Sequence, residues 1–436
     1  MTDGFRKVLM IAYYFPPLGL SGVQRTVKFA KYLLKYGWKP TVLTVVPKGY
    51  YAYDESLLKE AEDAGIQIVR TNSLDANKLF KKKVIKTPSE RTRKVLRYCS
   101  DLVFIPDNKI GWKRNALRKG AELLAGESFD IIYATAPPQT DFLIGLGLKK
   151  KFGLPLVVDY RDSWLEYPFK YFPTPLHKWL NKRLERKVLK SADRIVVAHR
   201  RIKETILKTH RHLTYHDVAI IPHGYDAEDI PARFERSGSA KKMVVAHAGT
   251  FYGGRTPKVL LTAFANLLKH DEQWRERIEF VLIGNKRKDE TKLVEHLGVA
   301  PHVRFTGYLE HGACVRELMA ADVLWYALDH DILSPGKLYE YFGTRKPILA
   351  SIVEGYTQQL IKESGAARVV PIHDVAAHEA ALKELYAQFV QKQLPKPSPE
   401  FVDGFDRQNL TGELARIFQF LMDYDKGTFT KVEEAA

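Results

Sequence analysis

Cysteine is scarce in this sequence. Only two cysteines, Cys99 and Cys314, occur in 436 residues, and they lie far apart along the chain. This excludes the disulfide framework of small secreted proteins, and it leaves no cysteine cluster that could hold a metal. The usage fits a reducing compartment, and we expect a cytoplasmic protein.

Long apolar runs are also lacking. No segment approaches the ~18–20 apolar residues that span a bilayer. The first ten residues, MTDGFRKVLM, do not have the charged, apolar and small-residue regions of a signal peptide. We therefore expect a protein that is soluble or peripheral on a membrane.

Acidic residues are too few to balance the basic ones. The chain has 68 Lys and Arg against 51 Asp and Glu, a formal charge of +17, which predicts an anionic partner. Residues 78–119 contain fourteen basic residues and three acidic ones. We recognise no nucleic-acid-binding motif, so an anionic membrane surface or a phosphorylated substrate is the expected partner.

Alternating strand and helix patterns predict two α/β domains. The apolar run KVLMIAYYF, a glycine-bearing loop, the helical pattern VQRTVKFAKYLLKYG and the run PTVLTVV form one β-α-β unit, the start of a doubly wound sheet. A second such series begins at MVVAHAG, after a polar linker. We predict facing Rossmann-like domains over residues 1–226 and 227–408, with a helix and tail at 409–436 that return to the first domain.

The loop after the first strand of each domain combines glycine with a basic residue. These loops are PPLGLSGVQR and AGTFYGGRTPK. In open α/β sheets, ligands bind outside the carboxyl ends of the strands. Glycine lets a backbone N–H group approach an anion closely, and arginine matches phosphate oxygens. Both loops are therefore candidates for binding a phosphorylated ligand.

The segment SPGKLYEYFG, residues 334–343, predicts a nucleoside-diphosphate site. Gly336 and Lys337 lie at the start of a predicted helix, where free N–H groups and the helix dipole favour an anion. Glu340 follows about one turn, or ~6 Å, later, where its carboxylate could accept hydrogen bonds from a ribose. The alternative is that Glu340 only complements the dipole at the helix start.

Several segments together resemble glycosyltransferase family 4, whose members have the GT-B fold, through nearly the whole chain. The segments that carry the resemblance are YYFPPLGLSGVQR, IPHGYD, HAGTFYGGR, VRFTGYL, MAADVLWYAL and SPGKLYEYFGTRKPILA. FIPDNKIGW and VVDYRDSW match a bacterial subgroup that builds surface polysaccharides. The resemblance implies a hexosyltransferase that uses a nucleoside-diphosphate sugar as donor substrate and needs no cofactor.

The resemblance also assigns residues to the donor site. They are Gly22, Gly249 and Thr250 beside the donor phosphate and sugar, Arg255, Lys258, Ser334, Gly336 and Lys337 on the diphosphate, Tyr308 and Leu309 on the base, and Glu340 on the ribose.

Three positions depart from the family pattern. Many members have a glutamate eight residues before the one at position 340, and this chain has Ile332 there. His223 stands where asparagine is usual, and Ser21 stands where a glycine is common. The isoleucine at position 332 suggests a different donor sugar.

The family mechanism implies retention of configuration, in which the departing phosphate removes the acceptor proton and no protein base is needed. Arg255 and Lys337 would take up the developing diphosphate charge without a metal, and we recognise no Asp-x-Asp motif of the kind that metal-dependent glycosyltransferases use. If the reaction inverts, a base is required, and Asp162 is the candidate. The alternative for Asp159, Arg161 and Asp162 is a structural ion-pair cluster.

Two segments, residues 79–98 and 167–190, mix basic and aromatic residues. This composition suits binding at an anionic lipid surface, so we predict a lipid-linked glycan acceptor at the inner face of the cell membrane. Two alternatives stay open at this point. One is a nucleotide-sugar epimerase on the same scaffold, and the other is a protein that binds an anionic surface without catalysis.

Overall fold

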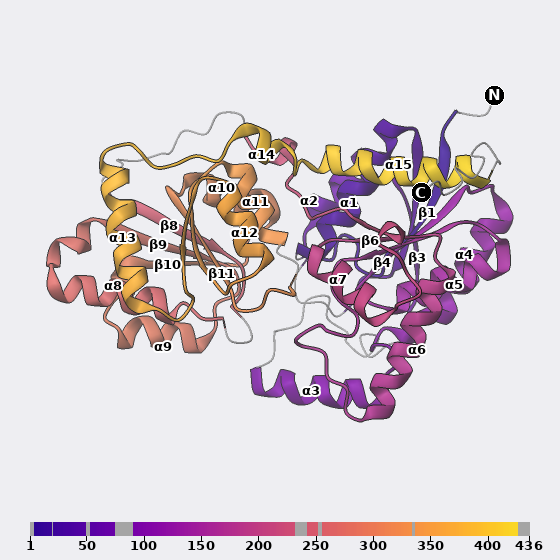
Figure 1. Cartoon of the computed structure of the whole chain (residues 1–436), viewed down its shortest axis with the longest axis horizontal. Helices are drawn as coiled ribbons and strands as arrows, with labels where there is room; N and C mark the ends of the chain where they lie inside the picture. The colour runs from indigo at the N-terminus through magenta and orange to yellow at the C-terminus, as the bar shows by residue number, and fades with distance from the viewer. Residues whose placement is uncertain are drawn as a thin grey trace, which may run out of the picture. The chain divides into compact units, whose positions relative to one another are not determined.

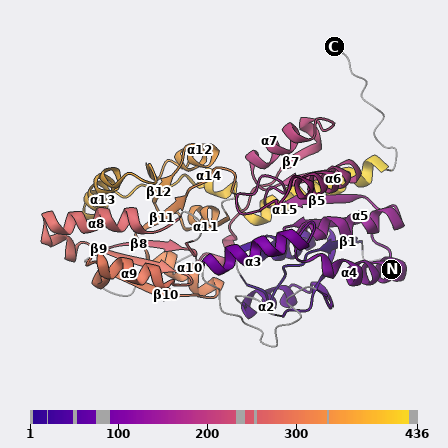
Figure 2. The ribbon, with the colours of Figure 1, turned by 90° about the horizontal axis from the view of Figure 1, so that it is seen from below.

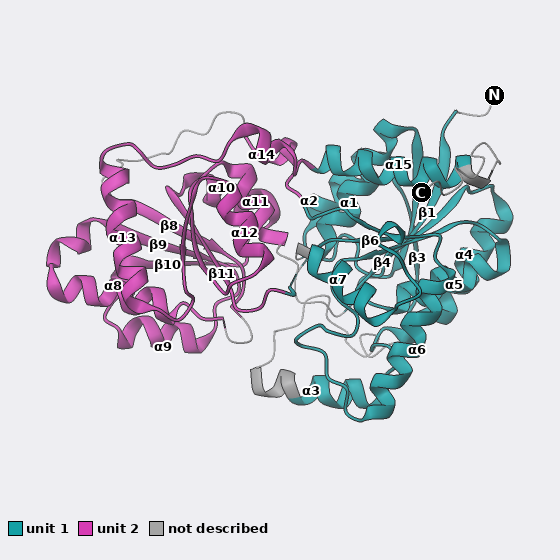
Figure 3. Cartoon of the chain, in the orientation of Figure 1, with its two compact units in different colours: residues 1–223, 332–334, 407–436 teal, residues 224–331, 335–406 magenta. Residues whose placement is uncertain are grey.

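The computed structural model describes residues 4–19, 21–48, 53–74, 90–231, 242–251, 255–333 and 336–425. The chain divides into two compact units (Figure 3). Unit 1 comprises residues 1–223, 332–334 and 407–436, and unit 2 comprises residues 224–331 and 335–406. The chain changes unit at residues 223/224 and 406/407, near the predicted boundaries at 226 and 408, and residues 332–334 are a short excursion grouped with unit 1.

In its described part, unit 1 contains a parallel sheet of seven strands in the order β3-β2-β1-β4-β5-β6-β7. The strands are β1 (Arg6–Ile11), β2 (Trp38–Val45), β3 (Gln67–Thr71), β4 (Ile131–Ala136), β5 (Leu156–Tyr160), β6 (Arg194–Val197) and β7 (Val218–Ile220). The helices are α1 (Ser21–Leu33), α2 (Glu55–Asp63), α3 (Glu90–Val103), α4 (Lys113–Gly126), α5 (Thr140–Phe152), α6 (Pro175–Ser191), α7 (Arg200–Thr209) and α15 (Arg407–Asp425).

Unit 2 has, in its described part, a parallel sheet of six strands in the order β10-β9-β8-β11-β12-β13. They are β8 (Met243–Ala248), β9 (Ile278–Ile283), β10 (Val303–Gly307), β11 (Val323–Leu328), β12 (Ile348–Ile352) and β13 (Ala367–Val370). The helices are α8 (Lys258–His270), α9 (Lys288–His296), α10 (His311–Ala320), α11 (Gly336–Thr344), α12 (Tyr356–Glu363), α13 (Val375–Val390) and α14 (Pro399–Asp403). The predicted class, two doubly wound α/β domains, is confirmed.

Continuous apolar runs form the central strands. Every residue of β4, β5, β8 and β11 is buried, because helices cover both faces of each sheet (Figures 1 and 2). Local signals end the helices: α5 stops at Gly153, whose φ of 75° is a left-handed conformation that glycine adopts at little cost.

The last helix packs against unit 1, as the fold prediction stated. α15 lies beside α1 (Figure 1). Arg407 donates a hydrogen bond to the side chain of Gln24 over 3.1 Å, and the rings of Trp38 and Phe418 meet edge to face at 5.1 Å. The chain therefore returns to its first unit after completing the second.

A buried ion pair links four elements of unit 1. Asp159, at the end of β5, accepts two hydrogen bonds from Arg25 of α1, at 2.8 and 3.0 Å. Tyr133 and Thr135 of β4 donate to the same carboxylate, and Arg25 also donates to the carbonyls of residues 221 and 222 after β7. Burial favours the neutral acid, but Arg25 and these donors outweigh it and hold the pKa of Asp159 below its ordinary value.

This arrangement corrects the expected ion-pair cluster. The partner of Asp159 is Arg25, the basic residue of the first loop, which the sequence analysis considered for binding phosphate. Its side chain is only 2% exposed and is paired with Asp159, so it is not available for that role. The Arg161 guanidinium instead donates to the backbone carbonyls of Ala136, Gly22 and Pro137. Arg161 thus ties together the loops at the carboxyl ends of the strands rather than neutralising a neighbouring aspartate.

We expect Arg25→Met to lower the free energy of unfolding by about 3–5 kcal/mol, because Asp159 would keep its charge in a buried site without a partner. Urea denaturation followed by circular dichroism measures the change. Glu122→Ala, which breaks the exposed pair between Lys119 and Glu122, is the control and should cost less than about 1 kcal/mol. Equal effects of the two substitutions would contradict the assignment.

Candidate functional site

The predicted donor residues of unit 2 gather at one edge of its sheet. Thr250 follows β8, Tyr308 follows β10 and Lys337 follows β11. All strands of this sheet run parallel, so their carboxyl ends share an edge. The strand order turns back between β8 and β11, which is the place where open α/β sheets bind ligands.

Glycines bring the backbone of three loops into close contact at this edge. Gly249 donates to the carbonyl of Ile283 over 2.8 Å, and Gly284 donates to that of Gly307 over 3.0 Å. A Cβ atom on Gly284 would lie 2.6 Å from the carbonyl oxygen of Gly249, and its φ of 143° is strained for other residues. The close contact of the loops after β8, β9 and β10 therefore requires glycine, because a side chain at Gly284 would clash with the backbone of Gly249.

Lys337 and Glu340 form an ion pair on the first turns of α11. Lys337 Nζ lies 2.8 Å from Glu340 Oε2, and the Glu340 side chain is buried. Burial disfavours the charge of Lys337, but Glu340 outweighs it and raises the pKa of Lys337 above its ordinary value. The lysine is therefore a permanent positive charge beside a carboxylate with a defined orientation.

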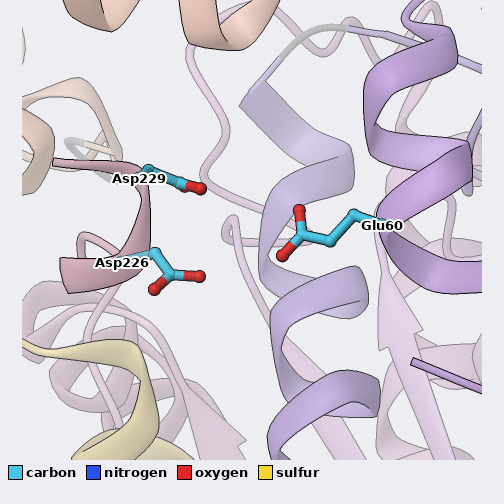
Figure 4. Close-up of side chains that lie close together, drawn as sticks. All are labelled: Glu60, Asp226 and Asp229. Atoms are coloured by element: carbon cyan, nitrogen blue, oxygen red, sulfur yellow. The ribbon is translucent and has the colours of Figure 1, made fainter. Parts of the chain in front are cut away.

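A histidine that the sequence analysis missed, His311, lies next to Glu340. His311, the first residue of α10, places Nδ1 3.9 Å from Glu340 Oε1, and its Nε2 lies 2.9 Å from Asp229 Oδ2. Asp229 and Asp226 come from the segment that opens unit 2 (Figure 4), where Asp226 caps a short turn by accepting from the N–H of Glu228. Figure 4 also labels Glu60, which belongs to α2 of unit 1 and accepts from Lys28 and Lys31 there.

Arg255 supplies a second cation at this edge. It precedes α8, and its Nε lies 3.6 Å from Oδ1 of Asp329, which follows β11. Arg255 therefore spans from the loop after β8 to the end of β11. Its side chain is mostly buried, at 15% exposure, so its charge acts in a poorly hydrated environment.

His247, in β8, lies near both cations and stays neutral. Burial, together with the charges of Arg255 and Lys337, lowers its pKa to about 4. Its Nδ1 lies 2.9 Å from the Trp325 carbonyl, which can only accept, so Nδ1 carries the proton. The ring stacks on Phe251 at 4.5 Å. Because Nε2 then presents a lone pair, His247 could accept a hydrogen bond but would not bind an anion.

An Asp-x-Asp spacing escaped the sequence analysis. It is Asp329-His330-Asp331, directly after β11. Asp329 is paired with Arg255. Asp331 accepts a hydrogen bond from the backbone N–H of Thr357, over 3.2 Å, at the start of α12. Each carboxylate thus has a contact within the protein.

The remaining predicted residues lie elsewhere. Gly22 is in unit 1, where its carbonyl accepts from Arg161. Asp162, also in unit 1, is half-buried, and burial raises its pKa to about 6 against the opposing charge of Arg161. Ile332, at the position of the missing glutamate, is grouped with unit 1 although Glu340 belongs to unit 2.

Leu309 follows Tyr308 after β10, and Lys258 is the exposed first residue of α8. Ser334 lies outside the described residues. The donor-site assignments stay predictions about ligand contacts, and what the structure adds is that one edge of unit 2 holds most of them.

Two family models match the chain. Residues 21–229 match the model described as Glycosyltransferase Family 4, and residues 242–388 match that described as Glycosyl transferases group 1. A search of curated protein sequences found no match.

Solved structures share the fold at low sequence identity. A glycosyltransferase from Rickettsia africae has a TM-score of 0.67 and 13% identity, covering 96% of this chain and 99% of that one. HepE of Anabaena, solved with UDP and glucose, has a TM-score of 0.66 and 14% identity, covering 95% and 99%. Sucrose-phosphate synthase from Thermosynechococcus elongatus has a TM-score of 0.62 and 14% identity, covering 96% and 100%.

We expect Lys337→Ala and Glu340→Ala each to weaken nucleoside-diphosphate binding by at least about tenfold, since each removes a charged contact worth roughly 1.5–3 kcal/mol. Calorimetric titration with UDP, GDP, TDP and ADP gives the affinities and the preferred base. Lys269→Ala is the matched control, because Lys269 is exposed in the last turn of α8, whose first turn lies at the site edge. Variants that bind as tightly as the parent would contradict the site.

The role of Glu340 has its own test. If its carboxylate binds the ribose hydroxyls, the parent should prefer the ribonucleotide over its 2′-deoxy form, and Glu340→Ala should lose most of that preference. An unchanged preference would mean that Glu340 serves only to position Lys337.

Proposed function

Because this chain belongs to the GT-B glycosyltransferases that resemble glycosyltransferase family 4, we propose that it transfers a sugar from a nucleoside-diphosphate sugar to a hydroxyl of a lipid-linked glycan. The transfer retains the anomeric configuration, needs no metal, and serves cell-surface polysaccharide synthesis. The observation that carries the proposal is the placement of Arg255, Lys337 and Glu340 at one edge of unit 2.

The two cations provide for departure of the leaving group. When the bond between the anomeric carbon and the diphosphate oxygen breaks, negative charge grows on the diphosphate. Arg255 and Lys337 offset that charge, and they are already held in place by Asp329 and Glu340, so little reorganisation is needed. The start of α11 at Gly336 adds backbone N–H groups and the positive end of a helix dipole.

Retention follows if the acceptor attacks from the face that the diphosphate leaves. The acceptor oxygen bonds to the anomeric carbon, and its proton passes to the departing phosphate oxygen, so no protein base takes part. Metal independence is supported by the same two cations, which supply the positive charge that a metal ion supplies elsewhere.

Inversion would require a base in unit 1, and Asp162 is the candidate. A pKa of about 6 leaves its carboxylate mostly ionised at neutral pH and able to accept a proton. Its position directly after β5 is at the ligand-binding edge of that sheet. The effect of substituting Asp162 therefore distinguishes retention from inversion.

We expect Asp162→Asn to retain activity within about tenfold, and NMR of the product to show the anomeric configuration of the donor. Activity should also survive EDTA. A loss of ~10²–10⁴-fold, with an inverted product and a parent rate that falls below pH 6, would assign Asp162 as the base instead. Conversion of the donor sugar to an epimer without transfer would indicate the epimerase alternative.

An exposed apolar surface of unit 1, which we call the α3–α6 face, supports membrane binding. Leu96 and Val103 of α3 and Leu176 and Trp179 of α6 are about half exposed or more. His177 lies 3.1 Å from the carbonyl of Leu102, so the end of α3 lies beside the start of α6 (Figure 1). Apolar side chains among Lys and Arg suit an anionic lipid surface. Among the described helices, none is long and apolar enough to cross a membrane.

We expect Trp179→Ser to weaken binding to vesicles of neutral and anionic phospholipid by about five- to tenfold, because it removes a large side chain from the lipid interface. Co-sedimentation measures this. Tyr215→Ser, which removes an aromatic side chain that is 66% exposed elsewhere on unit 1, should have no effect. If the parent fails to sediment with anionic vesicles, membrane binding through this face is excluded.

A further inference from the structure

A cavity of about 880 Å³ lies between α6 and α7 of unit 1. We call it the α6–α7 cavity. Five Lys and Arg line it against two glutamates, Glu166 and Glu204. The basic lining residues are Lys182 and Arg186 from α6, Arg201 and Lys208 from α7, and Arg211 after α7.

Four of these five cations form no ion pair within the described part of the chain, namely Lys182, Arg186, Lys208 and Arg211. Glu204 is already engaged by Arg200 and Arg201, at 3.2 and 3.0 Å. The lining glutamates therefore do not neutralise the positive charge of the cavity. Like charges held around one space repel each other, and an anion bound among them would relieve that repulsion.

A buried contact fixes the two walls of the cavity. His210, which caps the end of α7, lies 2.8 Å from Glu185 of α6, and both side chains are buried. The half-buried hydroxyl-bearing residues Thr205 and Thr209 also face the cavity. Lysine and arginine charges with threonine hydroxyls are the groups that bind phosphate oxygens.

The basic residues around the cavity also affect the pKa of a neighbouring histidine, His212. Burial lowers the pKa of His212, and electrostatic interaction with His210, Lys190 and Arg186 lowers it further, against the opposing effect of Asp217. His212 lines the same cavity. The surrounding cations thus disfavour one more positive charge, as expected at a site for an anion.

We propose that the α6–α7 cavity binds a phosphate or diphosphate group carried by a membrane lipid. The lipid is either the acceptor itself or a phospholipid of the bilayer. This inference rests on the proposed function, because unit 1 is then the acceptor unit of a transferase. The volume lies within the ~300–1,000 Å³ range of small-molecule sites. Lys182 follows the exposed Trp179 by one helical turn, so the cavity continues from the α3–α6 face.

Calorimetric titration with inorganic pyrophosphate tests the site. Arg255→Ala with Lys337→Ala serves as the background, so that the anion site of unit 2 does not contribute. Adding Arg186→Ala and Lys208→Ala should raise the Kd for pyrophosphate at least tenfold. The matched control adds Arg114→Ala and Lys150→Ala, which remove the same charges from exposed positions of unit 1 and should change Kd less than twofold. Equal affinity in the two proteins would overturn the proposal.

Two further assays distinguish the source of the phosphate. In detergent solution, a KM for the lipid-linked acceptor raised at least tenfold by Arg186→Ala with Lys208→Ala, at unchanged kcat, assigns the cavity to the acceptor. An unchanged KM with at least tenfold weaker binding to anionic vesicles assigns it to a phospholipid headgroup. An unchanged KM with unchanged vesicle binding would overturn the proposal.

Nucleoside-diphosphate binding separates this inference from the proposed function. The double variant Arg186→Ala with Lys208→Ala should bind nucleoside diphosphate as the parent does. If the parent binds none, the proposed function fails, whereas a pyrophosphate site that is lost with Arg186 and Lys208 still stands.

Discussion

Parallel strand pairing is the constraint on which the candidate donor site of unit 2 depends. Hydrogen bonding between parallel strands places all their carboxyl ends at one edge of each sheet. Segments as distant in sequence as Thr250 and Lys337 thereby become neighbours. At that edge the return helices begin, so free N–H groups and helix dipoles also face it.

Charge in the two units is handled in different ways. In unit 1, the buried pair of Arg25 and Asp159 is fully hydrogen-bonded and holds four elements together. In unit 2, Arg255 is paired with Asp329 and Lys337 with Glu340, and both cations act on the neutral His247. The first arrangement stabilises the fold, and the second keeps two positive charges together where an anion can compete for them.

The sequence predicted the parts of the site that depend on local rules. Helix α11 begins at Gly336, as the segment SPGK indicated, because helix starts have strong local preferences. It did not predict that His311 and Asp229 stand behind Glu340, because those residues come from separate elements. It also missed the spacing Asp329-His330-Asp331. It singled out residues 79–98 as a basic and aromatic segment, but it did not predict that helix α3 begins within that segment and exposes apolar side chains.

Residue patterns by themselves determined the α/β class, the two-domain organisation and the residue types at the strand ends. These features follow from the periodicity of apolar residues and from composition, which are properties of short segments. Only the tertiary structure decided which charges are paired. It paired Asp159 with Arg25 rather than with Arg161, and it placed Arg186 and Lys208 around one cavity with no acidic partner among the residues that the structure describes. The reason is that ion pairs depend on distances of a few ångströms between residues far apart in the chain, and no local pattern encodes those distances.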